Sequence, residues 1–294
     1  MPSDHLIALL WLLMLKSALM YLAPFVLTLV LAGAIRVLGG PERGARAAGV
    51  AVMLGFVLSW GFFLRPGWVQ AGYFSRIGHI AFGAGLVGLA LDLISAKRYW
   101  AALAAAIVIL VSTWASVTGG LSLPGSLSVP LTGGLALTVG GLAVVAFLII
   151  ARLDAARGRG ATAPILLGIA ALGVSFMARV AGAPDLAATG LMLALAVAGY
   201  AVLQGAVALP VGDSIVLGAG ATLLALAWAL AQDKPEIRLA LLLVLLIFFA
   251  EGTAKRVPLP EARISAILYP LVLAGVAALP CTLAVLIAYV MAHP

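Results

Sequence analysis

Apolar segments of about twenty residues follow one another along nearly the whole chain, separated by short turns that hold most of the charged residues. A helix needs roughly 20 apolar residues to cross the hydrocarbon core of a bilayer. Of the 294 residues, 65% are hydrophobic and only 9% are charged, whereas about 25% of the residues in a soluble domain are charged. The sequence therefore predicts an all-α, polytopic integral membrane helix bundle.

About ten transmembrane helices account for residues 1–294 as a single transmembrane domain, in which residues 1–16 form an apolar N-terminal extension. We expect helices broken or kinked at Pro24, Pro210, Pro270 and Pro280, because proline removes a backbone hydrogen bond. The predicted spans cover residues 17–38, 45–64, 76–95, 101–118, 131–151, 163–182, 186–208, 212–231, 237–251 and 264–291.

Lysine and arginine are unequally divided between the two ends of these spans. Eleven fall in loops on one side, five fall on the other, and Lys16 is unassigned. Cytoplasmic loops carry the excess of basic residues, so we expect both termini on the non-cytoplasmic side. A bacterial inner membrane is favoured, because the bacterial outer membrane holds closed barrels rather than helices.

The net charge of +7 does not indicate a nucleic-acid partner, since the basic residues are scattered in short loops. They are better suited to anionic lipid head groups, so the expected partners are membrane lipids and other membrane proteins. The lone cysteine, Cys281, excludes an intrachain disulfide. Phosphate-binding, zinc-protease and nucleophile-elbow motifs are absent. We therefore expect no catalytic residue, no cofactor and no metal site, and hence no enzyme.

The third predicted span carries a row of small residues that ends in an acid. Its members share one helix face because they lie three or four positions apart: Gly78, Ala81, Gly85, Gly88 and Asp92. Small residues let another helix approach closely, so we expect a partner helix here, with Arg76 and His79 on the opposite face. Two similar rows are also interpreted as helix contacts: Ser214, Gly218, Ala221 and Ala225, and Gly134, Thr138 and Gly141.

An acid inside a membrane span is costly unless it is paired, so Asp92 is the foremost candidate residue. It is either the protonatable or cation-binding acid of a carrier, or it forms a salt bridge that fixes helix ends. The expected basic partners are Lys97, Arg98 or a residue of the 36–46 loop.

Four further polar residues are candidates for transport or packing. Tyr200 and Gln204 lie four positions apart on the seventh span, where they line a polar cavity or form interhelical hydrogen bonds. His79 is expected to bond a neighbouring helix. Glu251 lies near a span end, as Arg179 and Asp213 do, and long or charged side chains at such positions reach the interface.

The leading functional hypothesis is a permease or carrier for a small or lipophilic molecule. It depends on the number of spans, the prolines within them and the few intramembrane charges. The alternative is a non-catalytic subunit that anchors or assembles a larger membrane complex, and a lipid-modifying enzyme is least supported. A carrier predicts a midplane cavity lined by Asp92, Tyr200 or Gln204, whereas an assembly subunit predicts a solid bundle.

Overall fold

The computed structural model describes the backbone of residues 3–64, 73–94, 98–118, 133–158, 160–207, 209–257 and 263–293. Side chains are described in the same segments apart from residues 3–17, 73–75, 98–99, 115–118, 133–136 and 263–267. Every regular element in this part of the chain is a helix.

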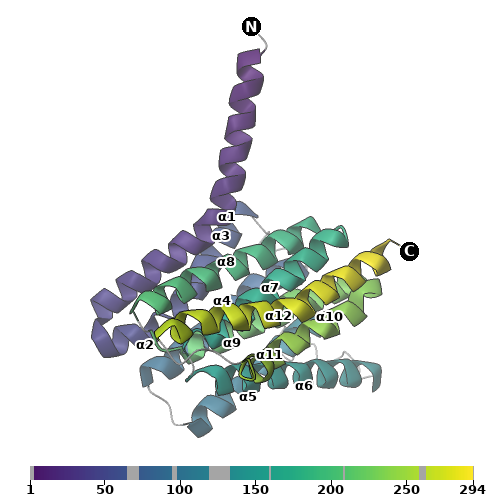
Figure 1. Ribbon diagram of the computed structural model, residues 1–294. Helices are drawn as coiled ribbons and strands as arrows, with labels where there is room; N and C mark the ends of the chain where they lie inside the picture. Colours follow the sequence, from purple (N-terminus) through teal and green to yellow (C-terminus); the bar gives the residue numbers. More distant parts are fainter. Residues whose placement is uncertain are drawn as a thin grey trace, which may run out of the picture.

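The elements form a bundle of long helices joined by short connections (Figure 1). In chain order they are α1 (Ser3–Gly39), the π-helical turn η1 (Gly40–Gly44), α2 (Ala45–Ala47), α3 (Val50–Phe63), α4 (Tyr73–Ile94), α5 (Arg98–Thr118), α6 (Gly133–Ala156), α7 (Thr162–Val180), α8 (Pro184–Val207), α9 (Asp213–Asp233), the 3₁₀ segment η3 (Pro235–Ile237), α10 (Arg238–Val244), the 3₁₀ segment η4 (Leu245–Phe249), α11 (Ala250–Ala254) and α12 (Arg263–Ala292).

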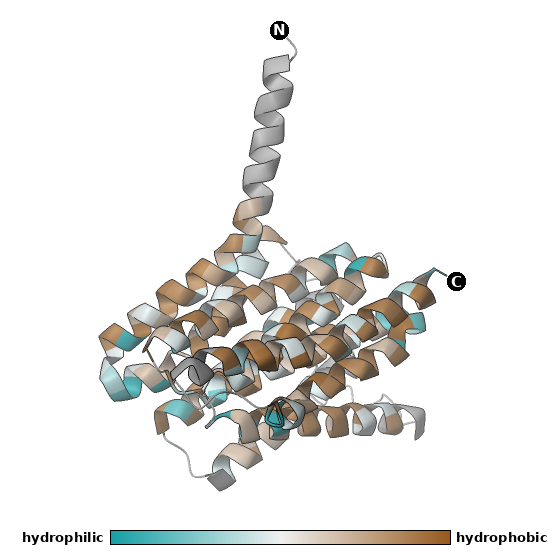
Figure 2. Ribbon diagram, viewed as in Figure 1, coloured by the Kyte–Doolittle hydropathy of each residue, from teal (hydrophilic) through white to brown (hydrophobic). Residues whose placement is uncertain are grey.

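Within the described residues, eight helical stretches are long and apolar enough to cross a membrane, and two shorter apolar helices, 50–63 and 100–114, accompany them. Each of the ten predicted spans therefore coincides with a helical stretch. Large apolar side chains such as Leu110, Phe147 and Leu271 are exposed on the outside of the bundle. Figure 2 shows hydrophobic residues along the helices and hydrophilic ones mainly near their ends. The prediction of a polytopic membrane helix bundle is confirmed.

Of the four prolines expected to break or kink a helix, three lie in helices that stay unbroken, and α1, which holds one of them, changes direction sharply along its length (Figure 1). Pro24 lies within the continuous helix α1, and Pro270 and Pro280 lie within α12. Only Pro210 lies in a break, between α8 and α9. The other break divides the ninth span at η4, where the backbone tightens to 3₁₀ geometry. No proline or glycine occurs between Arg238 and Phe249, so no local sequence signal marks this site.

Helix α9 lies in the centre of the bundle. It packs most extensively against α4, and it also contacts α3, α5, α6, α7, α8 and α10. Every residue from Ser214 to Leu223 is buried. The row Ser214, Gly218, Ala221 and Ala225 is therefore a helix contact, as predicted.

The row of small residues on α4 faces inward, also as predicted. Gly78, Ala81, Gly85, Gly88 and Asp92 are all buried, whereas His79 and Gly83 on the opposite face are exposed. A β-carbon at Gly88 would overlap the backbone of Asp213 and Ser214 at the start of α9. Glycine is needed there because the two helix backbones meet directly.

The third predicted row, on α6, is not a helix contact at Gly141. That residue is exposed, and a β-carbon placed on it would have no atom within 4 Å. Gly134 lies outside the described side chains. Gly141 instead lines an open space that α6 shares with α9 and α10.

Candidate functional site

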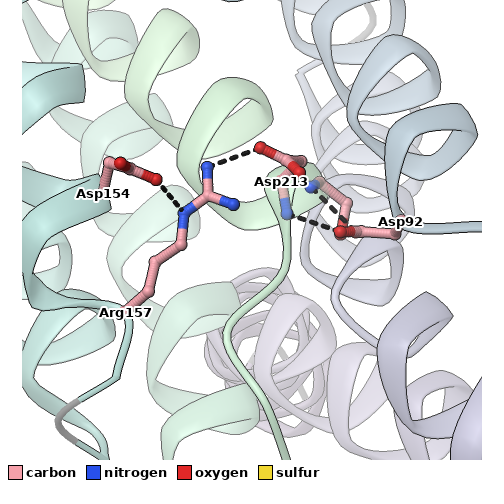
Figure 3. A network of polar contacts seen from close by, with 5 residues as sticks. Asp92, Asp154, Arg157 and Asp213 are labelled. Carbon is pink, nitrogen blue, oxygen red and sulfur yellow. Dashed lines mark hydrogen bonds and ion pairs between the residues drawn. The ribbon is translucent and has the colours of Figure 1, made fainter. Parts of the chain in front are cut away.

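Asp92 binds the amino-terminal end of α9. Its Oδ1 accepts a hydrogen bond of 2.6 Å from the backbone N–H of Asp213, and its Oδ2 accepts one of 3.0 Å from that of Ser214 (Figure 3). The first N–H groups of a helix have no partner within the helix, and the helix dipole favours a negative charge beside them. Asp92 thus caps α9 from a different helix. The side chains of its expected partners Lys97 and Arg98 lie outside the described residues.

Arg157 joins the end of α6 to the start of α9. Its Nη2 lies 2.5 Å from Oδ1 of Asp213, and its Nε lies 2.9 Å from Oδ1 of Asp154 (Figure 3). Asp213 was expected to reach the interface, but it is partly buried in this ion pair. Its position in the sequence gives no sign of its partner, because Arg157 lies 56 residues away.

Tyr200 and Gln204 hold the connection between α8 and α9. The hydroxyl of Tyr200 donates a 2.8 Å hydrogen bond to the carbonyl of Pro210. Nε2 of Gln204 donates to the carbonyls of Leu209, at 2.9 Å, and Gly160, at 3.1 Å. Both side chains are hydrogen-bonded, but none of these bonds is the interhelical bond that the sequence predicted. The bonds go to the backbone of connecting segments instead of to side chains in a midplane cavity.

These contacts bring together loops that the sequence assigned to one side of the membrane. Besides the bonds already described, Nη1 of Arg36 on α1 donates a 2.6 Å hydrogen bond to the carbonyl of Val207. The ends of α1, α4, α6 and α8 and the start of α9 therefore meet at one end of the bundle. We call this set the end cluster: Arg36, Asp92, Asp154, Arg157, Tyr200, Gln204 and Asp213.

The end cluster borders a cavity of about 240 Å³ whose described lining is mostly apolar, with three charged residues. Asp154, Arg157 and Asp213 line one part of it, and alanines of α5, including Ala102 and Ala105, line another. Asp154 and Asp213 both contact the guanidinium of Arg157, so each carboxylate has a basic partner, and the three groups together keep one formal negative charge. The residues at this cavity hold the ends of α5, α6 and α9 together.

The remaining candidate residues are not members of the end cluster. Arg76 precedes Asp92 by sixteen positions on α4, which places it about 24 Å away along the helix at 1.5 Å per residue. His79 is exposed on the outer face of α4. Arg76 and His79 therefore lie well away from the end cluster along α4. Glu251 forms a 2.9 Å ion pair with Lys255, one turn later at the end of α11.

A second cavity, of about 300 Å³, lies between α6, α9 and α10. Its walls are almost wholly apolar and include Gly141 and Val145 of α6, Leu223 and Trp228 of α9, and Phe248 of η4. One charged residue, Arg238 at the start of α10, belongs to the described lining. We call this space the α6–α10 cavity. This cavity was not predictable from the sequence, because its lining comes from α6, α7, α9 and the divided ninth span, all of ordinary apolar composition.

Nε of Arg238 donates a 2.9 Å hydrogen bond to the carbonyl of Ala231, which holds the exposed guanidinium beside the last turns of α9. Among the described residues, no group of three or more His, Cys, Asp or Glu side chains is placed to hold a metal ion. No protein-family model matches the chain, and no curated protein is significantly similar to it.

Proposed function

We propose that this polytopic membrane protein is a carrier for a lipophilic molecule, and not an enzyme, and that the α6–α10 cavity binds that molecule. The cavity supports the proposal because its size falls at the lower end of the range of ligand pockets, about 300–1,000 Å³, and its walls match an apolar ligand. The lining offers almost no polar groups to bind a hydrophilic solute, so the cavity does not favour a carrier of such solutes.

The broken ninth span adds support, because it forms one wall of the cavity. Leu245 and Phe248 of η4 line it, together with Leu241 and Val244 of α10. A 3₁₀ stretch within a helix often marks a hinge, and carriers commonly place their binding sites at discontinuous helices. Movement about η4 would change the opening of the cavity while α9, which packs against seven other α-helices in the described part of the chain, stays in place.

Lipid flux in reconstituted vesicles tests this proposal. The probe is phosphatidylglycerol with a fluorophore on an acyl chain, and the readout is the fraction that an impermeant reductant bleaches over time. We expect faster exchange between leaflets than in vesicles without protein. Gly141→Leu should abolish the gain, because the new side chain grows into the cavity, whereas Gly140→Leu should retain it.

Gly140 is a matched control for Gly141. Both glycines are exposed on α6, and a β-carbon on either one has no atom within 4 Å, but only Gly141 lines the cavity. The carrier proposal is refuted by flux that equals that of protein-free vesicles, or by flux that Gly141→Leu leaves unchanged.

The second candidate function is a non-catalytic subunit that anchors or assembles a larger membrane complex. The end cluster favours it, because Asp92, Tyr200 and Gln204 all bind backbone groups that hold connecting segments in place. This function predicts that a fixed partner co-purifies in mild detergent at a constant ratio. A monodisperse preparation of this chain alone, active in the flux assay, excludes it.

We further propose that the end cluster lies on the cytoplasmic side of a bacterial inner membrane, with both termini on the other side. Three arginines near this end of the bundle support the orientation, because basic residues favour the cytoplasmic side. They are Arg36, Arg157 and Arg152, whose guanidinium carbon lies 4.2 Å from the ring centre of Phe249.

A further inference from the structure

The α6–α10 cavity has one charged end. Arg238 is the first residue of α10 and follows the short turn after α9, so it stands where the helices leave the hydrocarbon layer. The rest of the described lining is apolar except for Thr138, Trp228 and the glycine Gly141. A ligand that fits this space has an apolar body and a polar group at the level of Arg238.

The guanidinium of Arg238 is positioned to bind an acceptor. Its Nε is bound to the carbonyl of Ala231, which fixes the direction of the planar group. Among the described residues, no protein atom accepts a hydrogen bond from its two terminal nitrogens. Asp233 and Glu236 lie nearby in the chain but are exposed and are absent from the cavity lining. A guanidinium pairs well with phosphate or carboxylate oxygens.

We propose that the α6–α10 cavity binds an acyl chain of a membrane phospholipid whose anionic phosphate group is held by Arg238. The inference deepens the proposed carrier function and depends on it, since it assigns a ligand class to the same cavity. The chain lies between α6 and α10 against α9, and the headgroup stays at the membrane surface. A zwitterionic lipid carries the same phosphate, but its own ammonium group offsets that charge, so selection for anionic over zwitterionic lipids depends on the charge of one side chain.

Trp228 supplies a local probe, because it lines the cavity and bromine atoms on an acyl chain quench tryptophan fluorescence on contact. The protein is placed in nanodiscs of unlabelled phosphatidylcholine with small mole fractions of chain-brominated phosphatidylglycerol or phosphatidylcholine. Subtracting the quenching of Trp228→Phe isolates the signal of Trp228 from that of the other five tryptophans.

We expect brominated phosphatidylglycerol to reach half-maximal quenching at a roughly fivefold lower mole fraction than brominated phosphatidylcholine. The reason is that one basic residue near an anionic lipid contributes about 1 kcal/mol. Arg238→Gln should remove this preference. Arg238→Lys should keep most of it, because it retains the charge although it loses the bond to Ala231. The control Arg179→Gln, an exposed arginine outside the cavity lining, should leave the preference unchanged.

The outcomes separate this inference from the function on which it depends. Equal quenching by both lipids in the wild-type protein, or a preference that survives Arg238→Gln, overturns the role of Arg238 but leaves an apolar ligand possible. Quenching that Gly141→Leu does not reduce shows that no chain enters the cavity, and the carrier proposal then fails as well. Melting temperatures of all variants confirm that each is folded.

Discussion

Asp92 shows how a single acid is accommodated inside an apolar bundle. Its two oxygens accept the N–H groups of Asp213 and Ser214 at the amino end of α9. Gly212 is part of this arrangement, because a β-carbon there would overlap the carboxylate. The sequence predicted that Asp92 needs a partner, but it could not identify a backbone terminus 121 residues away, since backbone donors carry no sequence signature.

Replacing Asp92 with asparagine should destabilise the protein. The amide retains one acceptor oxygen but places an NH₂ group against a backbone donor, and charge-assisted hydrogen bonds of this kind contribute about 1.5–3 kcal/mol. We expect a lower melting temperature in detergent, measured by intrinsic fluorescence. Asp233→Asn, at the exposed far end of α9, serves as the control. Equal melting temperatures for the two variants would contradict the capping role.

Glycines mark the places where two helices of this bundle come closest to each other. The rows on α4 and α9 were predictable from spacing, because side chains three or four positions apart share a helix face. The row on α6 has the same spacing yet leaves Gly141 at an open cavity. Spacing therefore identifies a face that allows close approach, but it does not reveal whether a helix occupies that face. The division of the ninth span at η4 was likewise not predictable locally, because no proline or glycine occurs between Arg238 and Phe249.

Gly88→Ala should weaken the contact between α4 and α9. The added methyl group meets backbone atoms of Asp213 and Ser214, which cannot rotate away, and overpacking costs about 1–3 kcal/mol. Thermal unfolding of the purified protein measures the effect. Gly83→Ala on the same helix is the control, since its β-carbon meets nothing within 4 Å and alanine favours helices. A Gly88→Ala variant as stable as Gly83→Ala would show that the two backbones do not meet.

At the level of the whole molecule, composition and periodicity predict the helical membrane bundle, and the described residues contain eight long and two shorter apolar helices. Three segments assigned to one side of the membrane, the ends of α1, α6 and α8, contact one another. The C-terminus lies at the opposite end of the bundle from α2 (Figure 1). The end of the bundle that faces the cytoplasm is assigned from the distribution of lysine and arginine alone. This orientation stays a prediction.

Labelling of intact cells tests that orientation. In a Cys281→Ala background, a membrane-impermeant maleimide should label His293→Cys near the C-terminus and should not label Glu42→Cys, which is exposed in η1. Both positions should react after the cells are lysed. The reverse pattern in intact cells would place the end cluster outside the cytoplasm.

The capping of α9 by a residue of α4 has a consequence for how the protein is made. The ribosome completes α4 long before it reaches Asp213, so the acid enters the nascent membrane protein without the donors that later surround it. Asp92 lies in the last turn of α4, and an unpaired carboxylate is costly in hydrocarbon, so this end of α4 is expected to stay at the aqueous interface until α9 arrives. Final seating of the two helices would then be a late event of biogenesis, coupled to synthesis of the last third of the chain.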